Sequence, residues 1–152
     1  MKKITPFLWF DTQAEEAMNF YVSVFKNANV LGVTPGPNGN ASSVNFELEG
    51  QEFIGFNAGP EFKFNEAVSL FVDCKSQEEV DELWEKLTAD GGEESMCGWL
   101  KDKYGLSWQI IPSELGTLLG DKDPEKAKRV MEAMLKMNKI VIADLQQAYN
   151  QE

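Results

Sequence analysis

Apolar and polar residues follow the same pattern twice along the chain. Residues 7–11 read Phe-Leu-Trp-Phe-Asp and residues 69–73 read Ser-Leu-Phe-Val-Asp, so each run is rich in aromatic and branched side chains and ends on aspartate. Such runs are typical of β-strands. Apolar residues at positions i, i+3, i+4 and i+7, the spacing of one helix face, follow each run. They are Ala17, Phe20, Tyr21 and Val24 after the first run, and Val80, Leu83, Trp84 and Leu87 after the second.

Both predicted helices begin with the pattern of a capping box. The first has Thr12 followed three residues later by Glu15, and the second has Ser76 followed by Glu79. In a capping box the hydroxyl accepts a hydrogen bond from a free backbone N–H of the first turn. Two strands, two caps and two stripes in the same order indicate an internal repeat.

Three further strands are predicted after each helix. They are residues 29–34, 43–48 and 51–57 in the first half, and residues 93–97, 99–103 and 107–111 in the second. Glu49-Gly50 predicts a tight hairpin, and Gly91-Gly92 marks the end of the second helix. The sequence therefore predicts an α+β fold of two tandem βαβββ modules, at about residues 3–60 and 66–113.

A helical tail is predicted from about residue 114 to residue 150. Asp123-Pro124 is a favourable helix start, and apolar residues at helical spacing then indicate one or two helices, with a break at Asn138. Met131, Met134 and Met137 lie on this stripe. They either fill a core, which is the usual role of such methionines, or cover a partner or the mouth of a cavity.

Composition limits the setting and the partners. With 43% apolar and 26% charged residues, the chain of 152 residues predicts one globular domain, residues 1–152. No apolar run reaches the roughly 18 residues of a membrane span. Two cysteines are too few for a disulfide framework, which favours the cytoplasm. The net charge of −11 disfavours nucleic acid and anionic lipid as partners.

The chain contains no histidine. This excludes Ser-His-Asp and Cys-His nucleophilic sites, zinc sites that use histidine, and the iron site of two histidines and one carboxylate.

Several segments resemble a known family. Ala14–Tyr21 in a βαβββ module is similar to the vicinal oxygen chelate superfamily, which includes glyoxalase, bleomycin resistance and extradiol dioxygenase proteins. Gly59–Glu66, Cys97–Gln109 and the tail segment Ala133–Met137 resemble its PhnB-like branch, often labelled 3-demethylubiquinone-9 3-methyltransferase. The resemblance covers residues 4–149. It implies a cup-shaped mixed sheet, a helical extension and a homodimer.

The resemblance also implies where a metal centre would lie. By position, the four metal ligands of the superfamily correspond to Ile4 or Pro6, and to Gly55, Ala67 and Gln109. Only Gln109 has a side-chain oxygen, and one neutral amide does not hold a divalent cation. The sequence therefore predicts neither a metal nor another cofactor.

Alternation along the strands predicts the lining of the cleft. Gly55 and Ala67 are expected to face the cleft. The larger side chains expected on the same face are Leu8, Phe53, Asn57, Ser69, Phe71 and Gln109. This mostly apolar lining suits a small uncharged or aromatic molecule.

Three functions remain open at this stage. The first is a protein that binds a small organic molecule, and the second is a metal-independent enzyme acting on a quinone-like or aromatic substrate, including the methyltransferase of the family label. The third is an interaction protein that docks through its tail. The common fold of methyltransferases that bind adenosylmethionine has a glycine-rich turn between a strand and a helix. Here the glycine-rich turn Gly36–Gly39 lies between two strands. Since the predicted lining holds no titratable group, binding is favoured over catalysis.

Overall fold

The computed structural model describes residues 2–151 and divides the chain into two compact units, Met1–Phe64 and Asn65–Glu152. Each unit is an α+β module with one four-stranded mixed sheet. The predicted fold class and the two βαβββ modules are thereby confirmed.

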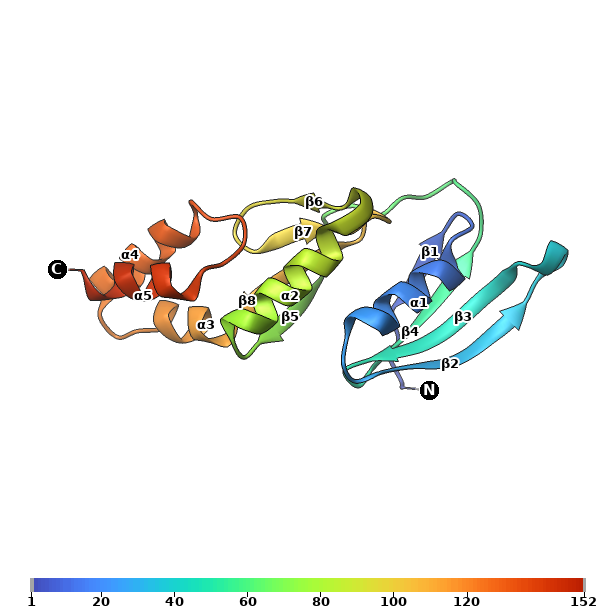
Figure 1. The fold of residues 1–152 in the computed structure, drawn as a ribbon, viewed down its shortest axis with the longest axis horizontal. Helices are drawn as coiled ribbons and strands as arrows, with labels where there is room; N and C mark the ends of the chain where they lie inside the picture. Colours follow the sequence, from blue (N-terminus) through green and yellow to red (C-terminus); the bar gives the residue numbers. More distant parts are fainter. Residues whose placement is uncertain (1, 152) are drawn as a thin grey trace. The chain divides into compact units, whose positions relative to one another are not determined.

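Unit one has the order β1 (Phe7–Phe10), α1 (Ala14–Val24), β2 (Ala28–Pro35), β3 (Ala41–Leu48) and β4 (Gln51–Asn57). In the sheet the strands lie in the order β1-β4-β3-β2, with β1 parallel to β4 and the other pairs antiparallel (Figure 1). Glu49 and Gly50 form the β3–β4 hairpin with positive φ angles of 49° and 88°. The predicted tight turn is therefore present.

Helix α1 covers one face of this sheet. Tyr21 of α1 stacks on Phe46 of β3, which in turn stacks on Phe53 of β4, with ring centroids 6.1 and 5.3 Å apart. The approach is close at Gly55, where a Cβ atom would lie 2.9 Å from the side chain of Val44. A larger residue at position 55 would clash with the Val44 side chain beneath α1, so packing favours glycine here.

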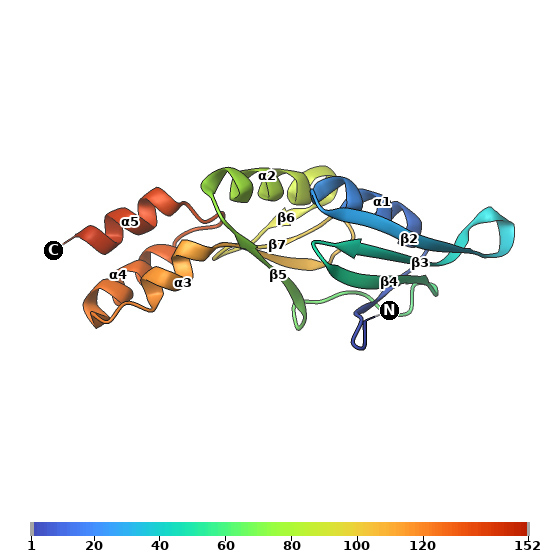
Figure 2. The same cartoon turned by 90° about the horizontal axis from the view of Figure 1, so that it is seen from below.

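Unit two repeats the arrangement with β5 (Ser69–Cys74), α2 (Gln77–Thr88), β6 (Glu93–Glu94), β7 (Trp99–Lys101) and β8 (Ser107–Pro112). Its strand order is β5-β8-β7-β6, and β5 runs parallel to β8. Helix α2 covers one face of this sheet (Figure 2). All four apolar residues of the predicted α2 stripe are buried, namely Val80, Leu83, Trp84 and Leu87.

Strands β6 and β7 are shorter than predicted. The predicted strand 93–97 ends at Glu94, and the predicted strand 99–103 ends at Lys101. Cys97 and Gly98 have positive φ angles of 61° and 85°, which no β-strand accommodates. Asp102 begins a turn, because its carbonyl accepts a hydrogen bond from the Gly105 N–H.

The tail forms three helices, where the sequence predicted one or two. They are α3 (Ser113–Leu119), α4 (Pro124–Met134) and α5 (Ile142–Asn150). They enclose a small core of buried residues, namely Ile111, Leu115, Val130, Ile140 and Leu145. Met134 and Met137 pack against this core, whereas Met131 is 41% exposed. The break between α4 and α5 spans residues 135–141 and includes the predicted Asn138.

Among the described residues, no helix has both the length and the apolar character needed to span a membrane.

The two predicted capping boxes have different outcomes. Ser76 Oγ accepts a hydrogen bond from the Glu79 N–H at 3.2 Å, as predicted, and Glu79 accepts one from the Lys75 N–H at 2.8 Å. Helix α1 instead begins after Gln13, whose side chain forms no cap. The Ala14 N–H donates to Asn57 Oδ1 at 2.9 Å, so a residue from β4 replaces the predicted Thr12 cap.

This difference predicts a result for two similar substitutions. Ser76→Ala should lower the free energy of unfolding by about 1 kcal/mol, because the first turn of α2 loses its cap. Thr12→Ala, at an exposed position without a capping contact, should change it by less than about 0.5 kcal/mol. Urea denaturation of both variants measures the two values. Equal losses would contradict the assignment of the caps.

Candidate ligand-binding face

The face of the unit-one sheet opposite α1 carries a cluster of aromatic side chains. Phe7 and Trp9 of β1 lie beside Ile54 and Phe56 of β4 in the parallel register. Phe62 joins them from the segment after β4. We call Phe7, Trp9, Phe56 and Phe62 the aromatic face. Phe7 and Phe62 are 56% and 59% exposed, which is unusual for side chains of this size.

The rings of the aromatic face contact one another edge to face or at a tilt. The ring centroids are 5.5 Å apart for Phe7 and Phe56, 6.3 Å for Trp9 and Phe56, and 4.9 Å for Trp9 and Phe62. These are favourable geometries for aromatic pairs. The cluster is therefore an ordered surface and not a set of independent side chains.

Backbone hydrogen bonds hold the segment after β4 against β1. The N–H groups of Ala58 and Gly59 donate to the carbonyls of Phe10 and Asp11. The Trp9 Nε1–H donates to the carbonyl of Gly59 at 2.9 Å. Because this hydrogen bond occupies the indole N–H, Trp9 presents only its ring to a ligand.

Leu8, Phe53 and Gly55 were predicted to face the cleft, but they lie on the face of the sheet that α1 covers. Leu8 and Phe53 are 7% and 4% exposed, and Gly55 faces Val44 and Ala14 under α1. Asn57 is used structurally, since its amide caps α1 and donates to the carbonyl of Ala41 at 2.9 Å. The predicted alternation of side chains along β1 and β4 is present, but the face expected to be open is the one that α1 covers.

In unit two, three predicted residues share the face opposite α2. The Gln109 Nε2–H donates to Ser69 Oγ at 3.0 Å, and Phe71 lies beside Gln109 in the β5–β8 register. Phe71 is 61% exposed. Trp108 points to the other face, where it is buried, as its alternation with Gln109 predicts. The predicted ligand-binding role of these residues stays a prediction.

Three of the four positions that the resemblance assigns to metal ligands have no side-chain donor atom. Pro6, Gly55 and Ala67 have no side-chain donor atom, and Gln109 is hydrogen-bonded to Ser69. Within residues 2–151, no three acidic or cysteine side chains come together in a way that could hold a metal ion. Gly55 also lies on the face that α1 covers. The absence of a metal stays a prediction.

The two cysteines differ in their surroundings. Cys74 is buried, and burial, followed by the nearby Glu79 and Asp73 carboxylates, raises the pKa of its thiol to about 12. A thiol is nucleophilic only as thiolate, so Cys74 is inert near neutral pH. Cys97 is half-buried, and its backbone N–H donates to the carbonyl of Met137 at 2.8 Å.

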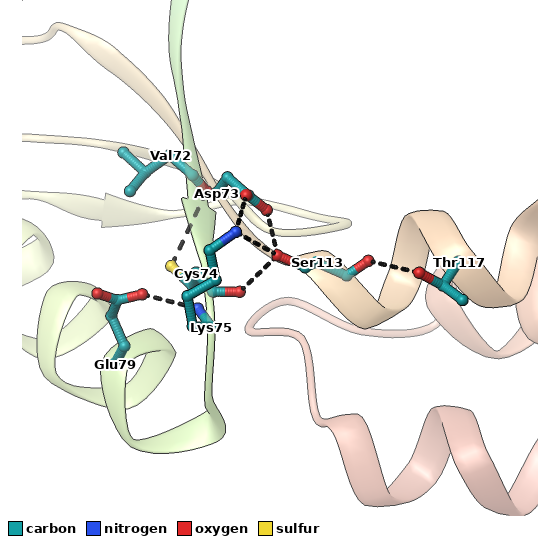
Figure 3. A network of polar contacts seen from close by, with 7 residues as sticks. All are labelled: Val72, Asp73, Cys74, Lys75, Glu79, Ser113 and Thr117. Atoms are coloured by element: carbon teal, nitrogen blue, oxygen red, sulfur yellow. Dashed lines mark hydrogen bonds and ion pairs between the residues drawn. The ribbon is translucent and has the colours of Figure 1, made fainter.

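A serine, a lysine and an aspartate meet where β5 and β8 end (Figure 3). Ser113 Oγ donates to Asp73 Oδ1 at 2.6 Å, and Lys75 Nζ lies 2.6 Å from Asp73 Oδ2 and 3.2 Å from Ser113 Oγ. The hydrogen bond and charge of Asp73 raise the pKa of Lys75, and Lys75 lowers the pKa of Asp73. Lys75 therefore stays protonated and cannot accept the proton of Ser113, as the base of a Ser-Lys catalytic dyad would. The three side chains instead connect the end of β5 to the start of α3.

Neither the aromatic face nor this trio was predicted from the sequence. The trio had a signal in the sequence, because Asp73 and Ser113 follow two strands that run parallel, and parallel strands end at the same edge of a sheet. The aromatic face depends in part on Phe62, which lies outside any strand and has no periodicity.

Comparisons with known proteins agree with the fold. The model of the family described as 3-demethylubiquinone-9 3-methyltransferase matches residues 2–111, which end before α3. The PhnB protein from Bacillus cereus is 36% identical, with a TM-score of 0.69 over 74% of this chain and 100% of that chain. No curated protein matches the chain.

Two more distant structures share the fold alone. Protein PA1353 from Pseudomonas aeruginosa is 16% identical, with a TM-score of 0.59 over 74% of this chain and 98% of that chain. The fosfomycin resistance protein from Listeria monocytogenes, solved with Mn(II) and 1S,2S-dihydroxypropylphosphonic acid, is 16% identical, with a TM-score of 0.55 over 77% of this chain and 99% of that chain. By its family match and its likeness to the Bacillus cereus protein, the chain belongs to the PhnB-like family described as 3-demethylubiquinone-9 3-methyltransferase.

Proposed function

We propose that this protein binds a small aromatic or uncharged organic molecule on its aromatic face, without the help of a divalent metal. The observation that carries the proposal is the ordered cluster of Phe7, Trp9, Phe56 and Phe62 on the open side of the first sheet. Exposed apolar clusters of this kind mark binding surfaces, because a ligand removes their rings from water.

The chemistry of the four side chains narrows the class of ligand. None of them carries a charge, and the single N–H among them already donates to Gly59. A flat ring is therefore favoured, bound by stacking and by burial of apolar surface. A quinone has this shape, and a quinone-like ligand would accord with the description of the family.

Binding is favoured over catalysis on this face. Transfer of a proton or a methyl group needs a side chain that accepts or donates it, and the four aromatic side chains supply none. The family resemblance also supports a homodimer in the cytoplasm, which we include in the proposal.

A titration with 2,3-dimethoxy-5-methyl-1,4-benzoquinone tests the proposal. Isothermal titration calorimetry should show binding that is unchanged by EDTA. Phe7→Ser and Phe62→Ser should each weaken it roughly tenfold, because each removes a stacking contact of about 1–1.5 kcal/mol and some buried area.

Leu135→Ser is the matched control, since Leu135 is 50% exposed and lies beyond β8 in the tail. It should leave the affinity unchanged. Wild-type affinity in both phenylalanine variants would refute the aromatic face as the site. Binding that is lost with EDTA and restored by Mn²⁺ would refute the metal-free part of the proposal.

A further inference from the structure

A polar hollow of about 190 Å³ lies beside β6, β7 and β8 in unit two. The residues that characterise it are three glutamates, a lysine, a tryptophan and a serine. They are Glu66, Glu93, Glu94, Trp99, Lys101 and Ser107. All of them belong to unit two, whereas the residues of the aromatic face belong to unit one.

Ser107 is the unusual member of this set. It is 1% exposed, and its Oγ has no hydrogen-bond partner among the described residues. A buried hydroxyl without a partner is destabilising and rare in folded proteins. Since Ser107 lines the hollow, a ligand there is the natural source of its missing hydrogen bond.

The charges around Ser107 favour a cation. Lys101 lies opposite Ser107 in the β7–β8 register and forms an ion pair with Glu66. This pair lowers the pKa of Glu66 and raises that of Lys101, so both stay charged and neutralise each other.

The carboxylate of Glu93 then remains, and it lies opposite Lys101 in the β6–β7 register, on the same face of the sheet as Ser107. Glu94 lies opposite Leu100 and accepts a hydrogen bond from Trp84 Nε1–H at 2.5 Å, so its carboxylate lies on the other face, beside α2. The charged side chains on the face of Ser107, namely Glu66, Glu93 and Lys101, therefore have a net charge of −1, in a chain whose own net charge is −11. An anion would be repelled, and a cation attracted.

We propose that this hollow is a binding site for a small organic ammonium ion. Its N–H groups would donate to Ser107 Oγ and to the carboxylate of Glu93, and the half-buried indole of Trp99, which shares this face, would lie against the cation. Each of these groups suits a cation that also donates hydrogen bonds. The site does not depend on the function proposed for the aromatic face.

Benzylamine, which is an ammonium ion at pH 7, is the probe, and benzyl alcohol is its neutral analogue. In calorimetric titrations at low salt, benzylamine should bind at least tenfold more tightly than benzyl alcohol. Glu93→Gln should weaken the binding of benzylamine about fivefold, while Glu132→Gln, the same change at an exposed position of α4, should leave it unchanged. Equal affinity for the two probes, or equal loss in both glutamate variants, would overturn the proposal.

Ser107→Ala separates a ligand-binding role from a structural one. Because the hydroxyl has no partner in the protein, the melting temperature of the free variant should be unchanged or higher. The affinity for benzylamine should nevertheless fall about fivefold. Unchanged affinity would overturn the role of Ser107. Phe7→Ser should leave benzylamine binding unchanged, and a loss in that variant would move the probe to the aromatic face.

Discussion

Replacement of Asp102 by alanine is expected to lower the free energy of unfolding by about 3–5 kcal/mol, since several buried donors lose their acceptor together. Asp102 is 2% exposed. Its Oδ1 accepts hydrogen bonds from the N–H groups of Tyr104 and Leu106 at 2.9 and 3.1 Å, and its Oδ2 accepts one from Trp108 Nε1 at 2.9 Å. One carboxylate therefore closes the β7–β8 turn and fixes the tryptophan beneath it.

Asn is an informative second substitution at this position. The amide oxygen of Asp102→Asn can keep the two backbone hydrogen bonds, but its NH₂ group would face the indole N–H, a donor against a donor. The loss should therefore lie between those of the wild type and the alanine variant.

Urea denaturation gives the free energies, and Asp144→Ala, at an exposed position of α5, is the control with an expected change below about 0.5 kcal/mol. A loss below 1 kcal/mol in Asp102→Ala would contradict the proposed role of the carboxylate.

Much of the fold follows from local patterns in the sequence. The stripe of Val80, Leu83, Trp84 and Leu87 predicted α2 and its buried face, because the helical period and the burial of apolar groups act together over a short stretch. The Glu49-Gly50 turn was equally predictable, since few residues adopt positive φ angles. The early end of β6 and β7 was not predictable in this way, because cysteine rarely adopts a left-handed conformation. Cys97 adopts it in a loop whose backbone is hydrogen-bonded to the carbonyl of Met137.

The face of the sheet that stays open was harder to predict than the strands. Strands β1 and β4 carry large apolar side chains on both faces: Leu8 and Phe53 point under α1, while Phe7 and Phe56 point away from it. Alternation separates the two faces but does not say which one the helix covers. Which face the helix covers depends on tertiary packing, and in the sequence Gly55 was the residue that indicated it. A glycine in mid-strand often marks close approach of another element, here α1.

A substitution at Gly98 is expected to have a comparably large effect, for a different reason. Gly98 has a φ angle of 85°, and an added Cβ atom would lie 2.6 Å from Ile111 Cδ1 and 3.1 Å from both the Ile110 carbonyl oxygen and Ile140 Cγ1. Ile111 and Ile140 belong to the core of the helical tail. The Gly98 N–H also donates to the carbonyl of Asn138 at 2.8 Å, so this residue joins β7 to the tail.

Gly105→Ala is the matched control for Gly98→Ala. Its φ angle is 88°, but a Cβ atom there would meet nothing within 4 Å. Gly105→Ala should therefore lose only the roughly 1–2 kcal/mol of a left-handed L-residue, whereas Gly98→Ala should lose about 1–3 kcal/mol more from overpacking against the tail core. In hydrogen exchange, Gly98→Ala alone should deprotect the amide of Cys97 and those of α5. Equal losses in the two variants would show that Ile111 and Ile140 move aside readily, and the tail would then be only loosely attached to β7.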